Sequence, residues 1–194
     1  NLITYFDVDS ILYNPDLAAY KALVRTTLRK LDHVLWPALA LHTSYPVHVA
    51  RERRIPIVLW GALQANEQAG KFSHIDGVQM SQWCRTEHDL FGQDVRSALG
   101  TGAEVQPKKL YYYYYPEIQM LSRCGVIGIY LSNYLRWDPL VQNCSAVAEG
   151  FCPQKQNATF DPYERAGSSI YYELHDLLRL KRIGYRKCRA QLVR

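Results

Sequence analysis

The chain has 194 residues, which is enough for one well-packed domain and short for two. Its 48% hydrophobic and 21% charged residues exclude a predominantly disordered protein, and no run of eighteen apolar residues indicates a membrane span. The first residues lack the pattern of a signal peptide, so we expect a cytoplasmic protein.

The net charge of +5 is concentrated at the carboxyl end. Residues 177–194 contain seven basic side chains and no acidic one, and the rest of the chain has 16 basic and 18 acidic residues, a net charge of −2. These cations form either a solvated helix face or a contact for phosphate or a protein partner. A long nucleic acid would need basic residues along an extended groove, which the rest of the chain does not supply, so we expect no nucleic-acid partner.

The amino-terminal part of the chain predicts two helices. Asn14 and Pro15 are an N-cap and a first-turn proline, and apolar residues recur at helical spacing over 15–31. A shorter helix is predicted to begin at Tyr45 and to end in the basic run 51–54, whose cations suit the last turn of a helix.

Two uninterrupted apolar runs, 55–61 and 125–131, are typical of parallel strands that are covered on both faces. Between them, residues 78–90 predict a helix, and residues 92–110 show no period and are expected to form a loop. The five tyrosines at 111–115 predict a strand edge or an aromatic loop, with a stacking platform for a base or a sugar as the alternative.

Asp138 and Pro139 predict the start of a helix that ends near Gly150. A last helix is expected from about residue 169 to residue 184, with its apolar face buried. The order of elements predicts an α/β fold: one domain over 1–194, with a parallel sheet flanked by helices and a basic helical segment at 169–194.

Polar residues follow both predicted strands. Ligands of parallel α/β sheets bind at the carboxyl ends of the strands, so these residues are candidates for a site. The first group is Gly61, Gln64, Asn66, Glu67, Ser73 and His74, and the second is Ser132, Asn133, Tyr134, Arg136, Trp137 and Asp138.

Two His-Asp pairs, His88-Asp89 and His175-Asp176, add titratable groups. Neighbouring residues on a helix point about 100° apart, so each pair would act on a third group instead of forming an internal dyad. Each histidine is either a general base or phosphate contact, or a surface or capping residue. Motifs for serine nucleophiles, zinc proteases and phosphate-binding loops are absent. The five cysteines contain no CxxC pair, which indicates reduced thiols and no protein-held metal.

Eight segments in sequence order carry a resemblance to a known family. They are 20–25 (YKALVR), 45–50 (YPVHVA), 55–61 (IPIVLWG), 72–74 (FSH), 85–92 (RTEHDLFG), 129–138 (IYLSNYLRWD), 159–164 (TFDPYE) and 174–176 (LHD). Together they resemble the N-acetyl sugar amidotransferase family, which belongs to the PP-loop ATP pyrophosphatase superfamily and serves surface-polysaccharide (lipopolysaccharide) biosynthesis.

The resemblance implies an adenine nucleotide α-hydrolase-like (PP-loop) fold and a reaction that uses ATP and Mg²⁺. In this reaction the acetamido oxygen of a sugar or nucleotide-sugar is adenylylated, and ammonia from a glutaminase or synthase-type partner then displaces AMP to leave an amidine. The implied catalytic residues are His88, Asp89, Asp138 and Glu67. Those implied for cofactor binding are Trp60, Gly61, Ser73 and His74, and those implied for substrate binding are Asn133, Tyr134, Trp137, His175, Asp176 and Lys181.

The chain departs from the family pattern in one important respect. The Ser-Gly-Gly-x-Asp-Ser loop that binds pyrophosphate in this superfamily is absent from the 194 residues. We expect either that a preceding segment carries this loop or that the protein does not cleave ATP. Cysteine pairs that some relatives carry near Trp36-Pro37 are also absent, so we expect no zinc there. Two alternatives stay open: a PP-loop enzyme that modifies tRNA, and a non-catalytic module that binds nucleotides or docks a partner.

Overall fold

The computed structural model describes residues 2–61, 77–99, 105–136 and 138–150, together with Leu174, Leu177, Leu178, Leu180 and Lys181. The first elements are α1 (Leu2–Phe6), α2 (Leu17–Leu31), α3 (Trp36–Arg53), β1 (Ile57–Trp60), β2 (Gln79–Met80) and α5 (Gln82–Cys84). They are followed by the π-helix η1 (Arg85–Asp89), α6 (Val95–Leu99), the 3₁₀-helix η2 (Pro107–Tyr113), α7 (Ile118–Cys124), β3 (Ile127–Tyr130), the 3₁₀-helix η3 (Leu131–Asn133) and α8 (Pro139–Ala148).

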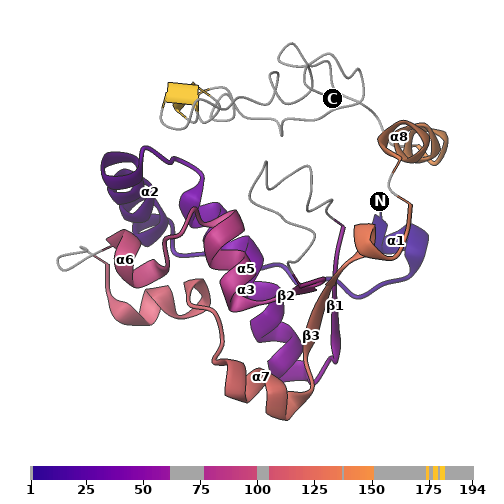
Figure 1. Ribbon diagram of the computed structural model, residues 1–194, viewed down its shortest axis with the longest axis horizontal. Helices are drawn as coiled ribbons and strands as arrows, with labels where there is room; N and C mark the ends of the chain where they lie inside the picture. Colours follow the sequence, from indigo (N-terminus) through magenta and orange to yellow (C-terminus); the bar gives the residue numbers. More distant parts are fainter. Residues whose placement is uncertain are drawn as a thin grey trace.

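The described strands form a small mixed sheet in the order β1-β3-β2 (Figure 1). β1 and β3 are parallel, with Ile57 opposite Ile127 and Trp60 opposite Tyr130. This pairing confirms the predicted parallel relation between the two apolar runs. β2 runs antiparallel to β3, which the sequence analysis did not predict.

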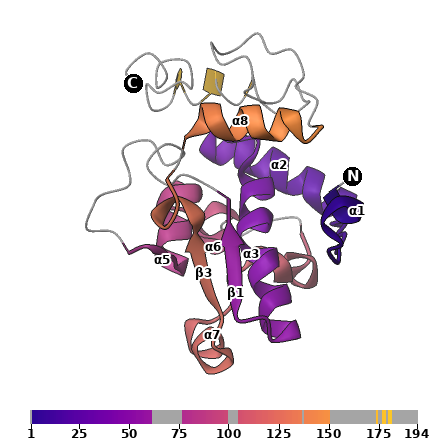
Figure 2. The same cartoon turned by 90° about the vertical axis from the view of Figure 1, so that its right-hand side faces the viewer.

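Helix α3 packs on one face of the sheet. Val47 and Ala50 of α3 are buried in a cluster against which Val58 and Trp60 of β1 pack. The alternate residues of the strands point the other way, and Ile57, Leu59 and Ile127 are 47%, 59% and 41% exposed. Figure 2 shows β1 and β3 in front, with α3 and α6 behind them. The prediction that both strands are covered on both faces is therefore wrong, because an apolar run fixes which residues can be buried and not whether a second layer covers them.

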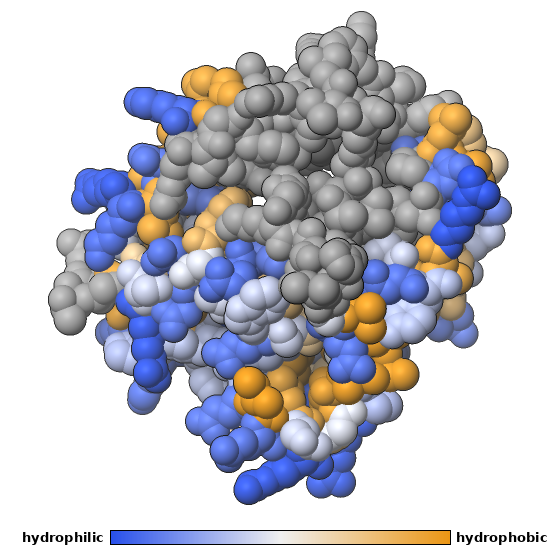
Figure 3. Space-filling model, viewed as in Figure 1, coloured by the Kyte–Doolittle hydropathy of each residue, from blue (hydrophilic) through white to orange (hydrophobic). Residues whose placement is uncertain are grey.

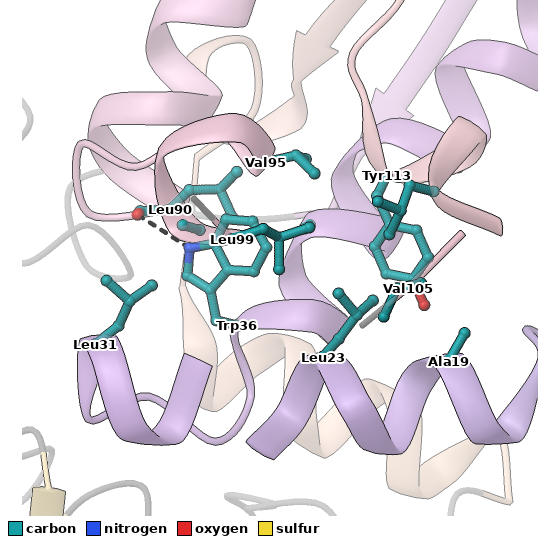
Figure 4. Packing of buried hydrophobic residues seen from close by; sticks show 12 residues of the cluster. Ala19, Leu23, Leu31, Trp36, Leu90, Val95, Leu99, Val105 and Tyr113 are labelled. Atoms are coloured by element: carbon teal, nitrogen blue, oxygen red, sulfur yellow. Dashed lines mark hydrogen bonds between the residues drawn. The ribbon is translucent and has the colours of Figure 1, made fainter. Parts of the chain in front are cut away.

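A second and larger core lies among the helices. It joins α2, α3, α6 and η2 around Leu23, Trp36, Leu90 and Tyr113 (Figure 4). The indole Nε1 of Trp36 donates a hydrogen bond to the carbonyl oxygen of Leu90 at 3.3 Å, so the largest apolar side chain of this core leaves no buried donor unsatisfied.

The two amino-terminal helices differ from the prediction in where they begin. Helix α2 starts at Leu17 because Asp16, not Asn14, is the N-cap and accepts a hydrogen bond from the backbone N–H of Ala19 at 2.8 Å. Helix α3 starts at Trp36 and continues through Pro46, instead of beginning at Tyr45. A proline inside a helix removes one backbone hydrogen bond, and packing of the flanking residues in two cores offsets that loss here.

The region between the strands contains three further differences. The predicted helix 78–90 begins as β2 and becomes helical only from Gln82, because pairing with β3 overrides the local helical pattern. The expected loop 92–110 contains α6, a five-residue helix that is too short for a periodic signal. The tyrosines at 111–115 are neither an edge strand nor wholly a loop, since the first three end the 3₁₀-helix η2, which Pro107 begins.

The carboxyl-terminal part confirms the helix predicted after Asp138. Asp138 is the N-cap of α8, and its Oδ1 accepts a hydrogen bond from the backbone N–H of Val141 at 3.2 Å. Figures 1 and 2 both place α8 beyond the carboxyl ends of β1 and β3. Much of the last predicted helix lies outside the described residues. Leu174 and Leu177 are helical but exposed, which contradicts the expected burial of these two side chains.

Apolar side chains reach the surface in several patches among hydrophilic ones (Figure 3). In the part of the chain that the structure describes, none of the helices has the length and apolar character needed to cross a membrane.

Candidate functional site

The carboxyl ends of β1 and β3 bring the two predicted polar segments to one edge of the sheet. Trp60 and Tyr130 are the last paired residues of the two strands, so Gly61 and the helix η3 begin next to each other. The side-chain amide of Asn133 in η3 donates a hydrogen bond to the carbonyl oxygen of Val78 at 3.3 Å. This bond draws the segment that enters β2 to the same edge.

Gly128, two residues before the carboxyl end of β3, allows Met80 and Trp60 to approach the strand closely. A Cβ atom at this position would lie 2.9 Å from Cβ of Met80 and 3.0 Å from Nε1 of Trp60. Trp60 is thereby packed against β2 and β3, and its indole meets the ring of His42 edge-on at a centroid distance of 5.8 Å. The candidate cofactor residue Trp60 also packs against the buried cluster that contains Val47 and Ala50 of α3.

The π-helix η1 carries the first His-Asp pair. π-Helices are rare and often occur at functional sites. His88 is only 5% exposed, and its Nδ1 lies 3.2 Å from Sγ of Cys84. The same sulfur lies 3.8 Å from the hydroxyl of Tyr130, at the carboxyl end of β3. Through these contacts the structure connects His88 to the edge at which Trp60 and Gly61 lie.

Asp89, the other member of the pair, is half-buried and lies near the guanidinium of Arg85. Arg85 is itself buried, and burial lowers its pKa to about 10, whereas the charges of Tyr115, Asp89 and Asp94 act in the opposite direction. An arginine is still protonated at neutral pH with such a pKa. The candidate carboxylate of Asp89 therefore interacts electrostatically with a buried positive charge.

Arg85 is held mainly by neutral oxygen atoms. Its Nε donates to the hydroxyl of Thr43 at 2.9 Å, and its Nη2 donates to the carbonyl oxygens of Ala40 and Tyr113 at 2.9 and 2.8 Å. The guanidinium also lies 5.7 Å from the ring centroid of Tyr115. These contacts join η1 to α3 and η2 and so fix the position of the His-Asp pair.

The remaining described candidates, Tyr134, Arg136, Asp138 and Lys181, all follow η3 in the sequence, and Arg136 is exposed. Tyr134 is exposed, Asp138 caps α8, and Lys181 is a helical, exposed residue. The hydrogen bond of Asp138 to the Val141 N–H is explained by helix capping alone, and the assignment of Asp138 to catalysis stays a prediction. Eight further candidates lie outside the described residues: Gln64, Asn66, Glu67, Ser73, His74, Trp137, His175 and Asp176.

The residues at this edge suit some parts of a nucleotide better than others. Gly61, Ser132 and Asn133 are neutral, and the hydroxyl of Ser132 is buried without a hydrogen-bond partner within the described part of the chain. A buried unpaired hydroxyl can be satisfied by a polar ligand, so this edge fits the base or ribose of ATP. Mg²⁺ needs carboxylate and phosphate oxygens, and among the described residues no three His, Cys, Asp or Glu side chains gather into a metal site.

The contacts of Cys84, Arg85 and Tyr130 were not predicted from the sequence. Cys84 and His88 are four residues apart, and this spacing on a helix was a usable signal that the two side chains meet. The position of Tyr130 follows only from the pairing of β1 with β3 and could not be found from spacing.

No protein-family model matches the chain, and no curated protein matches it at a significant level.

Proposed function

We propose that this protein is an ATP-dependent amidotransferase that converts the N-acetyl group of a sugar or nucleotide-sugar into an amidine. A glutaminase or synthase-type partner supplies the ammonia, and the reaction takes place in the cytoplasm as a step in making a surface polysaccharide. The proposal rests on the eight segments that resemble the N-acetyl sugar amidotransferase family and on how the fold arranges them.

One observation supports it most. Three of the resembling segments, 55–61, 85–92 and 129–138, meet at the carboxyl edge of the parallel pair. β1 and β3 bring the first and the last together, and the contacts from His88 through Cys84 to Tyr130 bring in the second. Residues that are distant in sequence and converge at such an edge are typical of ligand sites in α/β proteins.

The proposal assigns roles to these residues. ATP, with Mg²⁺, supplies the adenylyl group that turns the amide oxygen into a leaving group. Gly61 and Trp60 border the place of the adenosine, while Asn133 and Tyr134 lie where a sugar can donate and accept hydrogen bonds or stack on a ring. Asp89 is the base that takes a proton from ammonia as the C–N bond forms and AMP departs with the C–O electron pair.

The test uses the polypeptide expressed from its native start codon to its native stop codon. It is incubated with ATP, Mg²⁺, ammonium chloride and UDP-N-acetylglucosamine as a representative nucleotide-sugar. We expect pyrophosphate release that depends on the acetamido group, and a product whose mass corresponds to replacement of one oxygen by NH. Asp89→Asn and Asp138→Asn should each lower turnover by about 10²-fold or more, the scale for a lost acid, base or metal contact.

Glu117→Gln is a matched control because Glu117 is an exposed carboxylate that makes no side-chain capping bond. Full activity of both aspartate variants would remove these residues from the site. Binding of UDP-N-acetylglucosamine without pyrophosphate release would favour a non-catalytic module. Micromolar binding of tRNA that weakens steeply between about 50 and 200 mM salt would favour the tRNA-modifying alternative.

A further inference from the structure

Three buried side chains form a continuous polar contact between η1 and the sheet. Sγ of Cys84 lies between Nδ1 of His88, at 3.2 Å, and the hydroxyl of Tyr130, at 3.8 Å. Cys84 ends α5 and His88 lies four residues later, so both side chains project toward β3. The cysteine therefore contacts both of the other side chains.

The positions of these groups are fixed by their surroundings. The backbone N–H of Cys84 donates to the hydroxyl of Ser81 at 3.0 Å, which caps the start of α5. Tyr130 is buried and held in register by its pairing with Trp60. The ring of Trp83 meets the His88 imidazole edge-on at a centroid distance of 5.3 Å. Both sides of the Cys84 contact are thus anchored in secondary structure.

The chemistry of the three groups favours one direction of hydrogen bonding. A phenolic hydroxyl is a better donor than a thiol, so Tyr130 donates to the sulfur. A bare imidazole nitrogen is a better acceptor than a thiol sulfur, so the S–H group donates to Nδ1. Because the two bonds run in the same direction, each polarises the other favourably. In a neutral imidazole whose Nδ1 accepts, the ring hydrogen is on Nε2.

We propose that Cys84 is a positioning residue that sets the tautomer of His88. Its thiol donates to Nδ1, which places the ring hydrogen on Nε2 and makes His88 a hydrogen-bond donor toward an oxygen of the amide or the nucleotide. His88 is then not the base of the reaction, and this role is left to Asp89. The use of His88 in the reaction rests on the proposed function, whereas the tautomer is a property of the protein alone.

The test measures the tautomer directly by long-range ¹H–¹⁵N correlation of the imidazole in the full chain. The His88 signals are assigned by their loss in His88→Gln. We expect the Nε2–H form to dominate in the unaltered protein. In Cys84→Ala the ratio of Nε2–H to Nδ1–H should fall by about fivefold to tenfold, the equilibrium effect of losing one buried hydrogen bond.

Two further variants separate positioning from a packing defect. Cys84→Ser keeps a donor at the same place and should retain the Nε2–H form, while Tyr130→Phe removes the donor to sulfur and should have a smaller effect than Cys84→Ala. Cys124→Ala is the control, because this thiol is free and exposed. Melting temperatures of all variants show which of them are folded, and Cys84→Ser carries the test if Cys84→Ala does not fold.

An unchanged tautomer ratio in Cys84→Ala, or loss of the Nε2–H form in Cys84→Ser, would overturn the proposal. So would protonation of both ring nitrogens at neutral pH in the unaltered protein, since Nδ1 would then carry a hydrogen and could not accept one from the thiol. The amidotransferase assay is read separately. A tautomer that responds to Cys84 in a protein without this activity would support the positioning role and refute the proposed function.

Discussion

Arg85 and His88 lie three residues apart in one π-helix but belong to two very different regions of the molecule. Arg85 is buried between α3 and η2, beside the large helical core that contains Leu23, Trp36 and Tyr113. His88 faces Cys84 and Tyr130 at the sheet, where the buried clusters are small and the outer face of the strands is exposed. Among the described residues, the largest buried cluster therefore lies among the helices, whereas the proposed site lies at the edge of the sheet, next to the smaller clusters.

The largest effect is expected in the helical core. Trp36→Ala removes a fully buried indole and its hydrogen bond to Leu90, and it should lower the free energy of unfolding by about 3–5 kcal/mol. Leu59→Ala, on the exposed face of β1, should change it by less than about 0.5 kcal/mol. Urea unfolding of both variants measures the difference. Similar losses for the two would show that the sheet face is as important to stability as the helical core.

Arg85 is expected to be the next most sensitive position. Arg85→Met keeps much of the volume but leaves the carbonyl oxygen of Tyr113 without its buried donor and weakens the contact between α3 and η2. We expect a loss of about 2–4 kcal/mol in the free energy of unfolding. Arg123→Met changes an exposed cation in α7 and serves as the control. A higher free energy of unfolding in Arg85→Met would show that the buried charge does not stabilise the fold and would favour a role for it in the site.

Tyr115 lies where the two regions meet, since its ring packs against the sheet clusters and under Arg85. Burial raises the pKa of Tyr115 to about 12, against about 10 in an unfolded chain. The unfolded state therefore loses its proton first, and this contribution to stability is complete below pH 10 and is lost between pH 10 and 12. Burial also raises the pKa of Tyr113.

Between pH 10 and 12 the free energy of unfolding of the Tyr115→Phe variant should decrease by about 1–3 kcal/mol less than that of the unaltered protein, because phenylalanine has no hydroxyl to ionise. The free energy of unfolding of the variant should therefore depend less steeply on pH over this range. Unfolding in urea at pH 9, 10 and 11 checks the slope against that of Tyr134→Phe, which alters an exposed tyrosine. Equal slopes for both variants would mean that Tyr115 is hydrated in solution and that the two regions are not closely packed at this point.

The smallest effect is expected at the far side of the candidate site. Asp138→Ala removes the cap of α8 and should cost about 1 kcal/mol, seen as faster hydrogen exchange of the first α8 amides. Asp138→Asn should leave exchange almost unchanged because asparagine also caps helices. Reduced turnover in the asparagine variant would then report on the charge of the carboxylate and not on the helix.

Local signals explain which parts of the fold could be predicted. The apolar runs around Val58 and Ile129 predicted the parallel pair, and Asp138-Pro139 predicted the start of α8. Both predictions were possible because each feature depends on residues that are adjacent in the sequence. The exposure of Leu59 and the strand conformation of Met80 depend on which elements cover or pair with them. Such tertiary effects produce no periodic pattern in the sequence from which they could be predicted.

Some residues of the candidate site could likewise be predicted from the sequence, and others could not. The resemblance pointed to His88 and Asp89, and the fold connects the first of them to the sheet edge. The burial of Arg85 could not be predicted from the sequence. Its partners are mostly the backbone carbonyl oxygens of Ala40 and Tyr113, and a residue of any type has such an oxygen. Side-chain patterns can predict side-chain partners, but they cannot predict a cation that is satisfied by the main chain.

The close approach at Gly128 limits how the sequence of this protein can diverge. Ile127 and Ile129 on either side can exchange with other branched residues, because one is exposed and the other half-buried. Position 128 has no such freedom while Met80 and Trp60 keep their places, since even a methyl group would meet both. Replacement of this glycine in a related chain should therefore be accompanied by smaller side chains at positions 80 and 60, so that the three positions vary together.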